Sequence, residues 1–371
     1  MSEIIDSFLS ERIAAGDFPS AVYLVAEQGE IVLQNAIGNA VVEPELIPAQ
    51  RDTIYDLASL TKVLVTGLLC AKLLENGSIS LDTKPREIFG HVRRSDSTLR
   101  HLISHDSGLP AWRPFYLMVN DREDILAEIL KMPVEKGERK VVYSDLNFLK
   151  LTFLLESIYG KRIDQVFVDE VVKPLGLSDT FYSPASELRP RIAASEHGNA
   201  FEKLTCIAEK YLDPTDTATI SGKFRSNVIW GEVHDNNAYF MGGASGHAGL
   251  FATAADVLKI AMQFLPNYTT LLRPETCELF DTNFTPGMNE HRSFSFQLAS
   301  TPDSTAGTGL SPQSFGHLGF TGTSLWIDPV KERVYILLTN RTHDRALPFE
   351  NINSVRRRFH DLANEILDQN S

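Results

Sequence analysis

The sequence predicts a mixed fold, α/β plus all-α, in which both ends of the chain build one antiparallel sheet and a helical domain is inserted between them. Strand-like runs rich in β-branched residues occur at 21–38 and 319–340, whereas the intervening segments have mostly helical spacing. An inserted domain explains this order better than two consecutive domains. We therefore predict a discontinuous sheet domain, 1–82 with 291–371, flanked by helices, and a mainly helical domain with long loops, 83–290.

The first 80 residues predict a helix, a hairpin and a second helix. Residues 4–15 have the apolar spacing of a helix, and 21–27 and 31–38 are the expected strands of a hairpin. A longer apolar helix begins near Ser59, runs to about Glu75 and ends at an Asn-Gly pair.

The middle of the chain predicts helices, and strands return only near its end. The segment 183–246 is polar and rich in Gly, Asn and Asp, so we predict a structureless region that shapes a substrate cleft. Alternation predicts a strand at 294–298, a second hairpin from 319–327 and 333–340, and a final helix at 351–370. The helices expected in the middle are 99–104, 122–130, 146–159, 163–172 and 254–264.

Composition excludes several classes of protein. A formal net charge of −13 repels phosphate backbones, so nucleic acid is not an expected partner, and we expect the basic run 356–358 to be a solvated face with acidic partners. The three cysteines fit no zinc or redox spacing, and Cys70 falls in an apolar run where we expect it to be buried. The chain has no apolar run of about 18 residues, and its first residues lack the basic region and apolar core expected of a secretory signal. We therefore expect no membrane span and a cytoplasmic location.

A Ser-x-x-Lys pattern, Ser59 and Lys62, stands where the apolar helix begins. Residues three apart share a helix face, so a hydroxyl and an amine stand side by side. Serine is a poor nucleophile until a neighbouring group takes its proton, and a helix start offers N–H groups to a developing anion. The pattern indicates a serine acyltransferase without a Ser-His-Asp triad, although alone it also fits an exposed lysine beside a helical serine.

Two further segments agree with that chemistry. Tyr143 and Asp145 lie in Val-Tyr-Ser-Asp-Leu-Asn just before a helical stretch, and His317 and Gly319 precede a strand-like run. With the Ser-x-x-Lys pattern, they resemble the active-site motifs of the serine β-lactamase and penicillin-binding-protein superfamily. The chain looks closest to the class C β-lactamase-like branch, which includes many esterases and D-peptidases.

The resemblance covers nearly the whole chain. Residues 102–110 look like the family's Leu-Leu-x-His-x-Ser-Gly-Leu segment, and 246–254 look like its Gly-Gly-Leu-x-Ser-Thr segment. Five landmarks thus follow in the family's order. The resemblance implies a β-lactamase/transpeptidase-like fold, with an α/β domain, an all-α domain and the active site in the cleft between them.

Ser59 is the predicted nucleophile, which would attack a carbonyl carbon and form an acyl-enzyme; the alternative is a serine that caps its helix. Lys62 and Tyr143 are the candidate bases. Free lysine and tyrosine have pKa values of about 10, so neither is a base at neutral pH unless its surroundings change it. We expect the three to act as one unit, in which no single base need be identified. The resemblance implies that the backbone N–H groups of Ser59 and Phe320 form the oxyanion hole.

Two positions depart from the family pattern. Asp145 replaces an asparagine, and an ionised aspartate can only accept hydrogen bonds. It should therefore hold Lys62 protonated, which shifts the role of base toward Tyr143, and it should favour a substrate that carries an amine. The alternative is that Asp145 only caps the next helix. His317 replaces a lysine, and a largely neutral histidine favours ester or uncharged substrates over β-lactams. Gly319 should let the substrate approach the strand closely.

A polar cluster around His234, Asp235 and His247 has three possible roles: lining the substrate cleft, hydrogen bonding within loops, or binding a metal. Its spacing matches no ligand motif, so we expect the two histidines to bind substrate and expect no metal or other cofactor.

These observations predict a metal-independent serine hydrolase that acts through an acyl-enzyme on small carboxylic esters or D-amino-acid amides. The alternatives are a D,D-peptidase or weak β-lactamase, which would take a peptide or lactam, and a non-catalytic scaffold that keeps the fold. The sequence does not indicate an oligomeric state.

Overall fold

The computed structural model describes residues 2–90, 97–133 and 139–369, and its largest element is a seven-stranded antiparallel sheet. Strands from the two ends of the chain meet at its centre, where β1 pairs with β10, so the predicted sheet is confirmed. In sheet order the strands are β3 (Ile47–Pro48), β2 (Glu30–Val41), β1 (Ser20–Glu27), β10 (Arg333–Thr339), β9 (Ser324–Asp328), β8 (Phe315–Leu318) and β7 (Gln297–Leu298).

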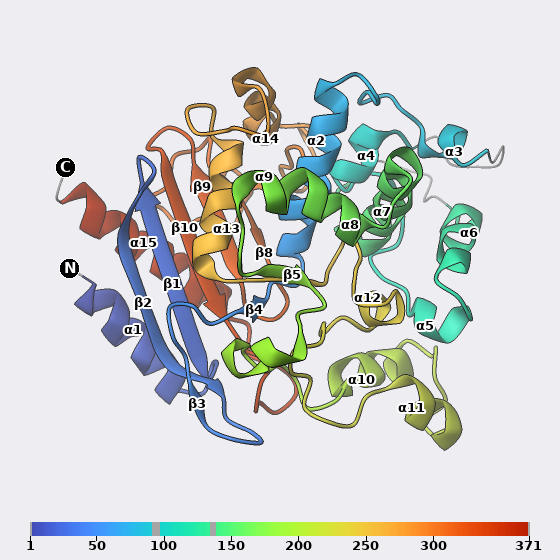
Figure 1. Ribbon diagram of the computed structural model, residues 1–371, viewed down its shortest axis with the longest axis horizontal. Helices are drawn as coiled ribbons and strands as arrows, with labels where there is room; N and C mark the ends of the chain where they lie inside the picture. The colour runs from blue at the N-terminus through green and yellow to red at the C-terminus, as the bar shows by residue number, and fades with distance from the viewer. Residues whose placement is uncertain (1, 91–96, 134–138, 370–371) are drawn as a thin grey trace.

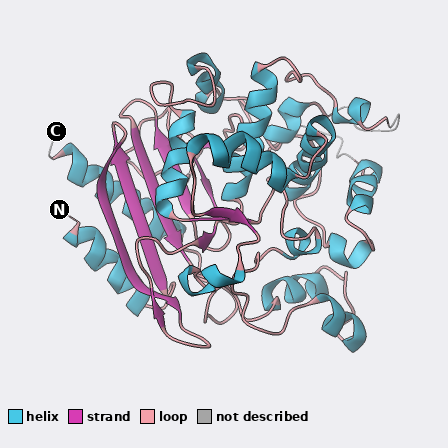
Figure 2. Ribbon diagram, viewed as in Figure 1, coloured by secondary structure: helices cyan, strands magenta, loops and turns pink. Residues whose placement is uncertain are grey.

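One face of this sheet is covered by the two terminal helices. Successive side chains of a strand point to opposite faces, and Tyr23 and Val25 of β1 point into a core shared with α1 (Glu3–Ala14) and α15 (Asn353–Asp368). Figures 1 and 2 show both helices on the outer side of the strands, close to the labelled chain ends.

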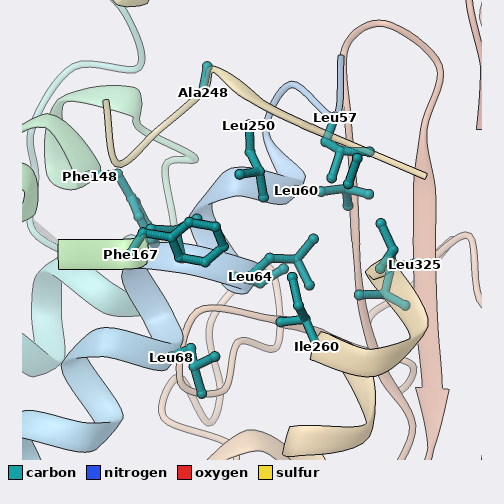
Figure 3. Close-up of a cluster of buried hydrophobic side chains, with 14 of the residues drawn as sticks. Leu57, Leu60, Leu64, Leu68, Phe148, Phe167, Ala248, Leu250, Ile260 and Leu325 are labelled. Atoms are coloured by element: carbon teal, nitrogen blue, oxygen red, sulfur yellow. The ribbon is translucent and has the colours of Figure 1, made fainter. Parts of the chain in front are cut away.

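The opposite face supports the rest of the molecule. Val22 and Leu24 of β1 belong to a second, larger core, and α13 (Ala254–Ala261) packs on β1 and β10 there. Figure 3 shows how Leu60, Leu64 and Leu68, on successive turns of the helix after Ser59, point into this core.

Most remaining helices are short and lie on that side of the sheet (Figure 2). A small sheet of order β4–β6–β5 lies among them, with strands Tyr55–Asp56, Leu250–Ala252 and Thr180–Tyr182. Within the described ranges the other α-helices are α2 (Leu68–Glu75), α3 (Pro85–Ile88), α4 (Leu99–Ile103), α5 (Phe115–Met118), α6 (Glu123–Lys131), α7 (Asp145–Tyr159), α8 (Ile163–Phe167), α9 (Lys173–Leu175), α10 (Ala200–Ala208), α11 (Thr217–Lys223), α12 (Asn236–Phe240) and α14 (Glu278–Asp281).

The structure corrects several predicted elements. The segment 183–246 is not structureless, because it contains α10, α11 and α12. The predicted strand 319–327 begins only at Ser324, since 319–323 is the turn that joins β8 to β9. The predicted strand 294–298 is reduced to β7, because Ser295 has a positive φ of 72° that interrupts the extended backbone.

The helix after Ser59 also differs from the expected regular α-helix. Its first turns form a π-helical segment, η1 (Lys62–Gly67), before α2 continues to Glu75. Other helices agree with their predictions to within a few residues, and α15 lies inside the expected 351–370, of which residue 370 is outside the described ranges. None of the described helices is long and apolar enough to cross a membrane.

Candidate active site

The segment before Ser59 is held by hydrogen bonds to two other parts of the chain. Ala58 has a positive φ of 47°, a conformation that non-glycine residues seldom adopt. The Asp56 carboxylate stabilises it by accepting the Ala58 N–H at 2.8 Å and the His234 N–H at 2.7 Å. Thr321 donates its hydroxyl to the Asp56 carbonyl at 2.7 Å, which ties the segment to the turn after β8.

Gly319 is required by close packing of this turn. A Cβ atom at this position would lie 2.6 Å from the Leu57 carbonyl oxygen and would overlap the Thr323 hydroxyl, which donates to the same carbonyl at 3.0 Å. The sequence predicted that a glycine here lets the substrate approach the strand closely. The structure adds a second reason for a glycine, which is the close packing of the turn against Leu57.

Lys62 is fully buried, and its ammonium forms two hydrogen bonds and one ion pair with oxygen atoms around it. Its Nζ lies 2.9 Å from Ser59 Oγ, 2.9 Å from the His247 carbonyl oxygen and 2.8 Å from Asp145 Oδ1. Burial alone disfavours the ammonium, but the Asp145 carboxylate and Tyr143 outweigh it, so the pKa of Lys62 is raised. Lys62 is therefore a cation at neutral pH.

Tyr143 completes the group around Ser59. Its hydroxyl interacts with both the Ser59 hydroxyl and the Lys62 ammonium. Burial raises the pKa of Tyr143, the Lys62 charge opposes that rise, and the Asp145 carboxylate adds to it. The net direction is upward, so the resting phenol keeps its proton at pH 7.

His317 is held as a neutral imidazole. Its Nδ1–H donates to the Leu318 carbonyl at 2.9 Å, while its buried Nε2 has no hydrogen-bond partner among the described residues. Burial, together with the charges of Arg292 and Lys62, holds the pKa of His317 well below its usual value. The ring lies 5.7 Å from that of Tyr143 and brings no positive charge to the cleft.

Ser59 and Phe320 both line a cavity of about 540 Å³. Neither of their backbone N–H groups donates to another group in the described part of the chain. An oxyanion hole needs two such free donors beside the nucleophile, so the predicted pair remains the candidate for it.

The cavity wall carries both acidic and arginine side chains. Asp145 and Glu202 come from α7 and α10, Asp235 directly precedes α12, and apolar surface is added by aromatic side chains such as Phe201. The last third of the chain contributes Arg292, Arg341 and Arg356 to the wall.

The two histidines of the predicted polar cluster turn to different carboxylates. His234 lines the cavity, stacks on Phe320 and contacts Glu196 at 2.8 Å through Nε2. The side chain of His247 is buried between Asp235, at 3.0 Å, and Ser245, and does not line the cavity. Its contribution to the site is the carbonyl that accepts from Lys62.

Comparison with known proteins agrees with this geometry. The family model described as Beta-lactamase matches residues 5–356. The chain belongs to the Beta-lactamase family. It is 30% identical over 372 residues to the Escherichia coli K12 protein named "Putative D-alanyl-D-alanine carboxypeptidase", an alignment that spans 91% of this chain and 82% of the relative. This Beta-lactamase-family protein is accordingly an enzyme, a serine hydrolase.

Solved structures of low sequence identity share its fold. The octameric penicillin-binding protein homologue from Pyrococcus abyssi matches with a TM-score of 0.73 and 19% identity, over 98% of this chain and 77% of that one. EstCE1, a hydrolase with promiscuous acyltransferase activity, matches with a TM-score of 0.70 and 20% identity, over 96% and 99%. The predicted β-lactamase/transpeptidase-like fold is thus confirmed.

Several residues of this Beta-lactamase-family site were not predicted from the sequence. Arg356 was expected on a solvated face, yet it is only 5% exposed and lines the cavity, and the prediction was wrong for it. Helical spacing could have indicated that Arg356 is buried, because it shares a helix face with the buried residues Ile352 and Phe359. Arg341 and Glu202 lie in no motif, and only the folded chain brings them to Ser59.

Proposed function

We propose that the enzyme hydrolyses small carboxylic esters or D-amino-acid amides through an acyl-enzyme on Ser59. The observation that carries the proposal is that the buried Lys62 ammonium contacts Ser59, Tyr143 and Asp145, all three of which line the cavity. A serine that is activated without a triad needs neighbouring side chains that can take the proton of its hydroxyl.

In the proposed acylation, Ser59 Oγ attacks the substrate carbonyl carbon and its proton passes to the Lys62–Tyr143 pair. The developing oxyanion is stabilised by the N–H groups of Ser59 and Phe320. As the tetrahedral intermediate collapses, the bond to the leaving group breaks and the pair returns the proton to the departing alkoxide or amine. Water then attacks the acyl carbon with the same pair as base, which frees the acid and regenerates Ser59.

Asp145 favours Tyr143 as the proton acceptor within the pair. It stabilises the Lys62 ammonium at 2.8 Å, and a permanent ammonium cannot take the serine proton. A phenolate beside that ammonium can, so proton loss from the pair should precede attack. We therefore expect kcat/KM to rise with pH above neutrality.

A D,D-peptidase is the second candidate, and the name of the E. coli relative favours it. The neutral His317 weakens the case for β-lactams, because it supplies no positive charge for a lactam carboxylate. Release of D-alanine from a D-Ala-D-Ala peptide, measured beside hydrolysis of an activated ester, distinguishes the two candidates.

Replacing the nucleophile tests the proposal. Ser59→Ala should lower turnover of p-nitrophenyl acetate by a factor on the order of 10⁶, as expected when one member of a cooperating unit is lost. It should also abolish labelling by a fluorophosphonate probe, whereas Ser78→Ala, at an exposed serine, should leave both unchanged. Retention of about a tenth of the wild-type rate in Ser59→Ala would exclude Ser59 as the nucleophile.

A further inference from the structure

His105 bonds to the backbone on both sides of Tyr143. It follows α4 in the segment 102–110, and the acylation proposed for this enzyme does not use it. Its carbonyl oxygen accepts the Val142 N–H at 2.9 Å, and its ring Nδ1 accepts the Ser144 N–H at 3.0 Å. One residue therefore holds the two chain neighbours of Tyr143.

The ring of His105 also packs against the ring of Tyr143. The two centroids lie 4.6 Å apart at an interplanar angle of 33°, and the centroid of Phe148 in α7 lies 5.1 Å from that of His105. His105 is fully buried, so its ring has little room to turn. Its backbone φ is 60°, a conformation that non-glycine residues seldom adopt and that concentrates at functional sites.

His105 is a neutral imidazole with its proton on Nε2. A backbone N–H donates to Nδ1, so Nδ1 must be unprotonated. Burial, together with the charges of Arg292 and Lys62, holds the pKa of His105 well below its usual value. Its one basic nitrogen is occupied by the Ser144 N–H, so His105 is not a base for Tyr143. Any effect on catalysis must act through the position of Tyr143.

Tyr143 needs such support because it lies on no regular element. Residues 139–144 form neither helix nor strand, whereas Lys62 belongs to a packed helix. The Tyr143 hydroxyl nevertheless has to interact with both the Ser59 hydroxyl and the Lys62 ammonium. A displacement of about 1 Å at a reacting group can lower a rate by about a hundredfold.

We propose that His105 is a positioning residue for Tyr143, whose carbonyl oxygen and ring Nδ1 hold residues 142 and 144 so that the phenol stays beside Ser59. The inference rests on the proposed function and adds to it a residue that touches neither the substrate nor the reacting atoms. It also gives a role to the histidine of the segment 102–110.

Two replacements of similar shape test the bond to Ser144. In His105→Asn the Oδ1 atom is attached to Cγ, as Nδ1 is in histidine, and can accept the same N–H, and asparagine tolerates a positive φ. His105→Leu has no acceptor. With p-nitrophenyl acetate we expect kcat to fall about a hundredfold in His105→Leu and less than about tenfold in His105→Asn. If His105→Leu does not fold, His105→Phe, which fills the space of the ring without the acceptor, replaces it.

The matched control is His343→Leu. His343 is also buried, its ring accepts the Val42 N–H at 2.8 Å, and it does not line the cavity. Its replacement should lower stability but leave kcat of the folded enzyme unchanged. A similar fall of kcat in His343→Leu and His105→Leu would count against a specific role of His105.

A double-mutant cycle with Tyr143→Phe distinguishes positioning from a general loss of structure. Once the Tyr143 hydroxyl is absent, His105→Leu should lower kcat by less than about twofold, because residues that act as a unit are not additive. The inference would be overturned by an equal loss in both backgrounds, by a wild-type kcat in His105→Leu, or by a kcat in His105→Asn as low as that in His105→Leu.

Hydrogen exchange separates this inference from the proposed function, because it needs no turnover. In a peptide covering residues 141–147, we expect the Ser144 amide to exchange about two- to tenfold faster in His105→Leu than in wild type, as for the loss of one hydrogen bond. Unchanged exchange in an active enzyme would overturn the inference and keep the proposed function. An enzyme that turns over no ester and takes no fluorophosphonate, yet shows the faster exchange, would refute the proposed function and keep the contact.

Discussion

Asp145 is the residue that most distinguishes the chemistry of this site. Its carboxylate raises the pKa of both Lys62 and Tyr143, because it stabilises the ammonium and repels the phenolate. The usual asparagine at this position carries no charge and would do neither. One residue thus sets the pH at which the pair loses its proton.

Asp145→Asn should consequently shift the pH dependence of catalysis. Without the carboxylate the pKa of Lys62 and that of Tyr143 both fall, so the pair loses its proton at a lower pH. The ascending limb of kcat/KM for a neutral activated ester should move to lower pH, measured between about pH 5 and 11.

Asp213→Asn, which removes an exposed carboxylate far from the motifs in sequence, is the control and should leave the profile in place. If the ascending limb of the kcat/KM profile does not move in Asp145→Asn, or moves to higher pH, Asp145 does not control the pKa of the base.

Residues that share a local motif could be placed from the sequence, whereas residues brought in by the fold could not. Ser59 and Lys62 are three apart on one helix, so their contact follows from spacing. His247 was expected to bind substrate, but nothing in its motif indicated that its ring would bond to Asp235 and leave only its carbonyl at the site. Arg341 follows a buried strand, and no sequence pattern places it beside Phe320.

At the scale of elements, the π-helical segment η1 depends on a glycine that touches another element. A Cβ atom on Gly67 would overlap the hydroxyl oxygen of Ser295 and lie 2.9 Å from its Cβ atom. Ser295 is fully buried and has a positive φ, so it has little room to move. Gly67 therefore allows the helix that carries Lys62 to lie directly against the segment before β7.

Gly67→Ala should destabilise the protein by about 1–3 kcal/mol through overpacking. Gly222→Ala is the matched control, because Gly222 is also helical, has an ordinary φ, and would carry a Cβ atom with no described neighbour within 4 Å. That change should be neutral or should stabilise by about 0.4–1 kcal/mol. Urea unfolding of both variants measures the difference, and equal midpoints would show that the helix can move away from Ser295.

Element prediction succeeded where an apolar pattern is long and failed where it is short. The helix α15 has a clear period of 3.6 residues, whereas β1 and α7 are long apolar runs that are buried along most of their length. In 183–246 the helices are at most nine residues long and lie among polar loops, so no window carries a period. The prediction joined the turn 319–323 to the apolar strand that follows it, whereas β8 already ends at Leu318 and β9 begins only at Ser324.

At the scale of the whole molecule, the order of strand-like and helical segments was enough to predict a sheet built from both chain ends. It was not enough to predict strand order, which depends on long-range pairing such as that of Ala21 with Thr339. The division into a domain 1–82 with 291–371 and a domain 83–290 stays a prediction. The larger core connects the two predicted domains, because it contains both Leu24 of the sheet and Phe148 of α7.

A core shared in this way should make the chain unfold as one cooperative unit. Separate domains unfold independently only where few contacts cross between them, and here the buried face of the Ser59 helix contacts both parts (Figure 3). In a variant with Trp112→Phe and Trp230→Phe, fluorescence would report β9 alone through buried Trp326, while far-UV circular dichroism reports all the helices. We expect the two urea transitions to coincide. A helical signal lost at lower urea than the Trp326 signal would instead mean that the inserted segment folds on its own, and that the cleft holding Ser59 can open while the sheet remains intact.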